Sequence, residues 1–302
     1  RSGPEKGASS RVLLDPNALD PDGLISLDWY RPSKDGAVLA FGLSRAGDEN
    51  STLHLLNVSS GEWLADEIPG KVDGVDWLPD ASGFFYSALA DISNPYSTQI
   101  RFHRVGQHPR HDRVLVTQTS TTWGPYATPS DDAHWLILGE YTSTRANDLW
   151  VADLDRWFRT GELVKTPIVV GQDARSGGPI VGDTLFLRTT LGAPNGRVFA
   201  VDLNRPDRKN WKEIIPERKD AALRSVSRAR GMLVGTYLQN ASTRIERFRH
   251  DGTSMGPLEL PGIGSARLIS HPDRSDAHLS FASYDVPRSI YRVDLAQGTR
   301  TL

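Results

Sequence analysis

A pattern of short apolar strands and polar turns recurs six times along this chain of 302 residues. The third strand of each repeat is its clearest landmark, at residues 53–58, 99–105, 148–154, 197–203, 244–249 and 289–295. These landmarks begin about 45 to 49 residues apart, the length of a repeat that forms one four-stranded sheet. Such a sheet cannot bury both of its faces by itself, so neighbouring repeats must cover one another. The period therefore predicts an all-β fold, a β-propeller of four-stranded antiparallel blades.

The turns between the strands favour the same architecture. The first repeat has the run 27–30 (Leu-Asp-Trp-Tyr), the turn 33–36 (Ser-Lys-Asp-Gly) and a second apolar strand at 38–41. The second repeat matches it with the run 75–78 (Val-Asp-Trp-Leu). The second repeat continues with the turn 79–83 (Pro-Asp-Ala-Ser-Gly) and the apolar run 84–86. Because an Asp-Gly turn between two apolar runs is a strong hairpin signal, the first pair of runs is predicted to form a β-hairpin, and the second pair repeats its pattern. Residues 155–161 suggest a helical turn.

The repeats predict a single domain. They run from about residue 11 to residue 302 with no visible linker, so residues 11–302 are expected to form one propeller domain of six full repeats. Residues 1–10 are polar and are expected to be a lead or linker. No α/β-hydrolase sequence accompanies the repeats.

Charge and composition argue against several classes of function. The 35 basic and 37 acidic residues leave a formal net charge of −2 without a long block of either sign, so nucleic acid is not an expected partner. No apolar run approaches about 18 residues, so no membrane span is expected. The chain contains no cysteine, which excludes thiolate catalysis, disulfides and cysteine-ligated zinc. These features leave the compartment unassigned.

Residues 252–256 (Gly-Thr-Ser-Met-Gly) match the G-x-S-x-G pattern in which serine hydrolases carry their nucleophile. That chemistry needs a sharp turn from a strand into a helix, whereas Pro257 follows here and no helix is expected to start. Asp273, Asp276 and His278 fall together in one turn, and do not approach Ser254 from separate elements. We therefore expect no catalytic residue in this chain.

Two groups of histidines raise the question of a metal site. His103, His108 and His111 lie close together in the sequence, and His271 lies near His278. A proline separates the histidines of the 108–111 run, and their spacing is not that of two ligands on one helix face. We expect no metal and no cofactor.

Polar residues are expected on the first strands of the repeats. They are Asp28, Asp73, Asp76, Ser176, Arg224 and Arg267. Such residues could line a channel of mixed charge, although a water-filled propeller channel needs polar residues for solvation alone. Some propellers are glycosidases or lactonases, but three aspartates spread this unevenly do not favour that chemistry.

Four stretches resemble the non-catalytic propeller of the prolyl oligopeptidases, serine peptidases that cut short proline-containing peptides. They are residues 12–17 (VLLDPN), the Asp22-Gly23 turn, the turn 33–36 with residues 40–42, and residues 209–217 (KNWKEIIPE). The resemblance covers roughly residues 11–302. It implies a relation to a seven-bladed ring, in which residues 12–14 would be the last strand of a preceding blade.

The resemblance also implies a function. In that family an α/β-hydrolase domain carries the catalytic residues, and the propeller caps it and excludes large folded proteins. This chain would then gate and select substrates for a prolyl oligopeptidase-like serine endopeptidase, without cleaving bonds by itself. Its expected partners are an α/β-hydrolase catalytic domain and short peptides. The alternative is a free-standing propeller that binds proteins or peptides.

The family carries over two substrate-side contacts. Phe85 matches an aromatic residue that helps to line the substrate pocket from the propeller side, with core packing as its alternative role. Leu191, which precedes the run 194–197 (Pro-Asn-Gly-Arg), stands where family members have an arginine that reaches toward the bound peptide. Because the chain departs from the family there, strict proline specificity is not implied.

Overall fold

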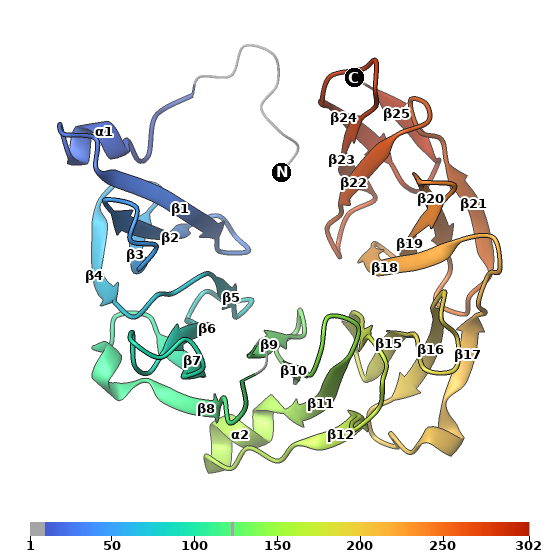
Figure 1. Ribbon diagram of the computed structural model, residues 1–302, viewed down its shortest axis with the longest axis horizontal. Coiled ribbons are helices and arrows are strands. Elements are labelled where there is room, and N and C mark those ends of the chain that lie inside the picture. The colour runs from blue at the N-terminus through green and yellow to red at the C-terminus, as the bar shows by residue number, and fades with distance from the viewer. Residues whose placement is uncertain (1–9, 122–123, 302) are drawn as a thin grey trace. The chain divides into compact units, whose positions relative to one another are not determined.

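The structure of the protein is a computed structural model that describes residues 10–121 and 124–301. The described residues form six antiparallel sheets (Figure 1). Two compact units contain three sheets each: one comprises the described residues up to Val170, and the other those from Gly171 onward. The predicted lead at residues 1–10 lies almost entirely outside the described residues.

The first unit contains three four-stranded sheets, and the strands of each follow one another in sequence order. The first sheet consists of β1 Ile25–Pro32, β2 Val38–Arg45, β3 Thr52–Asn57 and β4 Trp63–Ile68. The second consists of β5 Val75–Trp77, β6 Gly83–Leu89, β7 Thr98–Arg104 and β8 Arg113–Thr117. The third consists of β9 Pro125–Pro129, β10 Trp135–Tyr141, β11 Asn147–Asp153 and β12 Thr166–Val169.

The second unit repeats this topology. Its first sheet consists of β13 Ser176–Gly177, β14 Ile180–Val181, β15 Thr184–Thr189, β16 Arg197–Asp202 and β17 Lys212–Ile215. The next consists of β18 Ala222–Ala229, β19 Met232–Gln239, β20 Ser242–Phe248 and β21 Ser254–Leu258. The last consists of β22 Ser265–Ile269, β23 Asp276–Ala282, β24 Ser289–Asp294 and β25 Thr299–Thr301. The fourth sheet has a fifth strand because its first strand is divided between β13 and β14, which both pair with β15.

Helices are short in the described part of the chain. They are α1 Pro16–Leu19, α2 Leu154–Thr160 and the 3-10 turns η1 Pro109–His111 and η2 Arg208–Asn210. The predicted helical turn is confirmed by α2, which begins where the Asp153 carboxylate accepts a hydrogen bond from the Arg156 N–H and ends at Gly161, with φ 79°. Residues 12–14, which resemble the last strand of a preceding blade, join no sheet, and Val12 is exposed.

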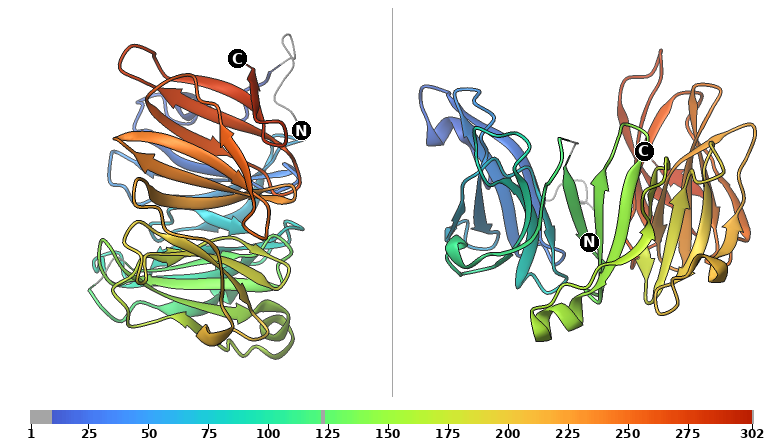
Figure 2. Two further views of the ribbon diagram at one scale, coloured as in Figure 1. Left: turned by 90° about the vertical axis from the view of Figure 1, so that its right-hand side faces the viewer. Right: turned by 60° about the horizontal axis from the view of Figure 1, so that its bottom comes forward.

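The hydrophobic cores lie between consecutive sheets of the same unit, which are stacked face to face (Figure 2). Leu55 of the first sheet shares a buried cluster with Phe84 of the second, and Phe102 shares one with Leu136 of the third. Equivalent clusters join the fourth sheet to the fifth and the fifth to the sixth. Each fully buried side chain of this size contributes about 1.5–3 kcal/mol. The predicted all-β fold with six four-stranded blades is confirmed.

None of the helices in the described residues combines the length and apolar character that a membrane span requires.

Candidate functional site

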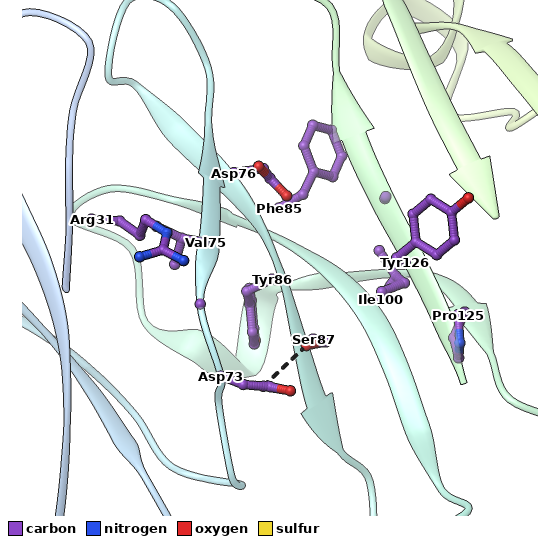
Figure 3. A pocket seen from close by; sticks show the side chains of 12 residues that line it. Arg31, Asp73, Val75, Asp76, Phe85, Tyr86, Ser87, Ile100, Pro125 and Tyr126 are labelled. Carbon is purple, nitrogen blue, oxygen red and sulfur yellow. Dashed lines mark hydrogen bonds between the residues drawn. The ribbon is translucent and has the colours of Figure 1, made fainter. Parts of the chain in front are cut away.

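The first unit contains a pocket of about 250 Å³ to which all three of its sheets contribute (Figure 3). Its floor is apolar and aromatic and consists of Phe85, Tyr86 and Ile100. Each of these residues is at most 3% exposed. Pro125 and Tyr126 of β9 form one wall. The opposite wall is polar and comes from Arg31 at the end of β1, Asp73 before β5, Asp76 within β5 and Ser87 of β6.

The two carboxylates of the pocket have few hydrogen-bond donors and few cations near them. Asp76 accepts no hydrogen bond from any described residue, and its charged neighbour is Arg31. Burial raises the pKa of Asp76 to about 6, while the Arg31 charge opposes the shift. Burial also raises the pKa of Asp73, against a 3.5 Å hydrogen bond from the Ser87 hydroxyl and the charge of Lys71. Both carboxylates also have exposed surface, so surrounding protein weakens their solvation without removing it.

We expect Asp76→Asn to raise the melting temperature by about 1–2 °C at pH 7.5 and to leave it unchanged at pH 4. A carboxyl whose pKa rises on folding loses stability as the pH rises from the unfolded value, 3.8, through about 6. Asparagine cannot ionise, so the variant avoids that loss. Because the carboxylate is exposed, solvent screening keeps the effect small. Thermal melts at the two pH values measure it, and a gain confined to pH 4 would contradict the assignment.

The two predicted substrate-side contacts lie in different units. Phe85 lies in the floor of the pocket, where its ring packs at 5.0 Å from that of Phe102 and 6.0 Å from that of Trp157. It therefore belongs both to the pocket lining and to a core. Leu191 lies between β15 and β16 in the second unit; its N–H donates to the Thr189 hydroxyl, and its carbonyl accepts from Arg197.

The six predicted channel residues are divided equally between the two units. Asp73 and Asp76 share the pocket, whereas Asp28 accepts hydrogen bonds from the hydroxyls of Ser44 and Ser51 and so stabilises its own sheet. In the second unit, Ser176 is buried against Thr189, and the side chains of Arg224 and Arg267 are exposed.

The G-x-S-x-G segment forms a turn between two strands. Gly252 has φ +89°, and Ser254 begins β21 with its hydroxyl accepting a hydrogen bond from the Gly256 N–H. No hydrogen bond joins Ser254 to an acid or a histidine in the described part of the chain. Asp276 is instead near Arg274 and Arg292.

Of the histidines considered as metal ligands, His103 lies in β7, whereas His108 and His111 lie at η1. His108 caps η1 through a hydrogen bond from the Arg110 N–H. A grouping that the sequence analysis missed brings His134, Asp153 and Asp155 within 4.8 Å of one another. Hydrogen bonds already engage all three side chains, because His134 pairs with Asp155 at 2.6 Å and Asp153 caps α2.

The structural role of His103 was also not predicted from the sequence. It is fully buried, with Nδ1 2.7 Å from an Asp112 carboxylate oxygen and Nε2 2.9 Å from one of Asp66. The Tyr86 hydroxyl donates to the other Asp112 oxygen at 2.6 Å. Because Asp66 belongs to β4 and His103 to β7, this network links the first two sheets. The sequence does not predict this network, since Asp66, His103 and Asp112 form no short motif.

The charges in this network are strongly coupled. Burial alone would lower the pKa of His103, but hydrogen bonds to Asp112 and Asp66 and their charges raise it to about 9. Burial opposes ionisation of Asp66, yet hydrogen bonds from His103 and the Gly106 N–H hold its pKa below the usual range. Burial and the bond to Asp112 raise the pKa of Tyr86. The network therefore holds a buried imidazolium between two carboxylates.

Comparison with known proteins places these observations in a family. The family model described as the N-terminal β-propeller domain of prolyl oligopeptidase matches residues 1–302. A prolyl endopeptidase from Elizabethkingia meningoseptica is 25% identical over 97% of this chain and 42% of its own length. The dual function macrocyclase-peptidase POPB of Galerina marginata is 27% identical over 94% of this chain and 42% of its own length. The chain thus spans less than half the length of the curated relatives it matches.

Solved structures agree with this comparison. A prolyl endopeptidase, studied for the role of inter-domain dynamics in catalysis and specificity, superposes with a TM-score of 0.90 and 33% identity over 98% of this chain and 44% of its own. Prolyl oligopeptidase B from Galerina marginata, bound to a 35mer hydrolysis and macrocyclization substrate, gives a TM-score of 0.84 and 26% identity over 93% of this chain and 41% of its own.

Proposed function

This chain belongs to the family of prolyl oligopeptidase N-terminal β-propeller domains, and from this premise we propose that it gates and selects peptide substrates for a prolyl oligopeptidase-like serine endopeptidase. Its partner is an α/β-hydrolase catalytic domain, and its substrates are short peptides. Residues 11–302 act as one propeller domain, which does not cleave peptide bonds by itself.

The match of the propeller family over the whole chain carries this proposal. Relatives of more than twice this length are named as peptidases, and Ser254 has no acid or histidine hydrogen-bonded to it among the described residues.

Phe85 and Leu191 are proposed as substrate-side contacts. The position of Phe85 in the pocket floor supports its assignment, because Phe85 lines the pocket although its ring also packs on Phe102 and Trp157. The assignment of Leu191 rests on its place in the loop before Arg197.

The experiment separates gating from simple binding. The purified chain is expected not to hydrolyse a chromogenic Gly-Pro amide. Mixed with the separately expressed hydrolase domain of a related prolyl endopeptidase, it is expected to restore cleavage of short proline peptides while cleavage of a folded protein stays low. The matched control is the hydrolase domain mixed with an unrelated β-propeller.

Two results would overturn the proposal. One is turnover of the amide by this chain alone. The other is peptide binding by the chain with no effect on the hydrolase domain, which would favour the alternative of a free-standing binding module.

A further inference from the structure

We propose that the pocket of the first unit binds a cationic side chain of a peptide, the ammonium of lysine or the guanidinium of arginine. The inference rests on the proposed function in that it names a class of peptide that the propeller would select. It assigns Asp76 and Asp73 as the residues that recognise the charge.

The charges of the lining favour a cation. The lining contains two carboxylates, Asp73 and Asp76, and one cation, Arg31, so it carries one net negative charge. Lys71 lies outside the lining, and its charge acts on Asp73. Asp76 has no hydrogen-bond donor among the described residues, and the only donor to Asp73 is the hydroxyl of Ser87 at 3.5 Å. A carboxylate with weakened solvation and no donor gains more from an ammonium or guanidinium group than a solvated one does.

The shape of the pocket favours one long side chain. Its volume of about 250 Å³ is below the range of about 300–1,000 Å³ in which whole small molecules bind. Phe85 and Ile100 offer an apolar floor to the methylene groups of lysine or arginine. The ring of Tyr126 adds an aromatic wall, to which a cation is attracted.

The arrangement of the walls matches a side chain with a charged end. Figure 3 shows Arg31, Asp73 and Asp76 on one side of the pocket and Pro125 and Tyr126 on the other. An anion is disfavoured there, because it would meet two carboxylates for one guanidinium. Arg31 is also engaged, since its guanidinium donates to the Tyr30 carbonyl at 2.9 Å.

The test measures peptide binding to the 302-residue chain by calorimetry, without any hydrolase domain. The probes are one proline-containing peptide with lysine, the same peptide with arginine, with norleucine or with acetyl-lysine, and the lysine peptide with an acetylated amino terminus. We expect the lysine and arginine peptides to bind about five- to tenfold more tightly than the norleucine and acetyl-lysine peptides. The preference is expected to shrink as salt is added.

The variant Asp76→Asn is expected to remove most of this preference, and Asp73→Asn to reduce it. Asp91→Asn is the matched control, because it removes the same charge from an exposed loop of the same unit, and it should keep the preference. Far-UV circular dichroism and melting curves confirm that each variant is folded.

Three results would overturn the inference: equal affinity for the lysine and norleucine peptides, an unchanged preference in folded Asp76→Asn, or no binding of any peptide at millimolar concentration. If acetylation of the amino terminus alone abolishes binding, the cation is the terminal ammonium and the side-chain assignment is wrong. The two proposals can fail separately. If the chain prefers cationic peptides through Asp76 but has no effect on the hydrolase domain, the gating function is contradicted and the cation site is supported.

Discussion

Replacement of His103 by alanine is expected to lower the free energy of unfolding at neutral pH by about 3–5 kcal/mol, because it leaves two buried carboxylates without their cation. The imidazole is fully buried and contacts Asp66 and Asp112 at 2.9 and 2.7 Å. Urea denaturation of the variant and the wild type measures the change. The matched control is His111→Ala, which removes an exposed histidine of η1 and should cost less than about 0.5 kcal/mol.

The same network predicts a pH dependence. The pKa of His103 is raised from 6.5 to about 9 on folding, so its stabilisation is fully present below about pH 6.5 and is lost as the pH rises through about 9. The lowered pKa of Asp66 affects stability at acid pH. The stabilisation from its carboxylate is present above pH 3.8 and is lost as the pH falls below that value. The wild type should therefore lose stability between pH 6.5 and 9, and His103→Ala should lack this slope. Equal slopes, or a midpoint unchanged by the substitution, would contradict the buried ion pair.

The second large effect is expected at Gly252, where alanine should cost about 3 kcal/mol or more. A Cβ atom there would lie 2.0 Å from the Ile214 carbonyl oxygen and 2.7 Å from its carbon, at a φ of +89°. Backbone atoms cannot move aside as a flexible side chain can, so the chain must shift. Thermal and urea denaturation measure the loss.

The other glycine of the same motif is the control. Gly256 has a similar φ of +87°, but the nearest atom to its added Cβ is an Arg247 nitrogen at 3.8 Å. Gly256→Ala should therefore cost only the conformational strain, about 1–2 kcal/mol. Similar losses at both positions would show that the close approach to Ile214 is not the cause.

Much of the fold could be predicted from the sequence, because its signals are local. The predicted third strand at 197–203 is β16 Arg197–Asp202, and the predicted third strand at 289–295 is β24 Ser289–Asp294. The turn at 33–36 forms as expected, with the Gly36 N–H donating to the Ser33 carbonyl. Residues 12–14 are apolar but have no neighbouring strand to pair with among the described residues, so they form no strand. The sequence Gly178-Pro179 lies between β13 and β14, where the first strand of the fourth sheet is divided.

The candidate site was less predictable, because it depends on distant neighbours. Asp28 and Asp76 occupy the same Asp-Trp position of two repeats, and the sequence offers no reason to separate them. In the structure, the hydroxyls of Ser44 and Ser51 satisfy Asp28, while Asp76 has no donor and lines a pocket. The role of His103 in the core could not be predicted from the sequence, since its partners come from another sheet and from a turn.

By itself, the sequence determined the repeat, the strands, most of the turns and the family, because each of these is written in residue types a few positions apart. Only the tertiary structure decided which polar side chains are satisfied and which face a pocket. The charge state of Asp76 or His103 depends on the solvent and charged groups around it, and folding alone brings those groups together from separate sheets.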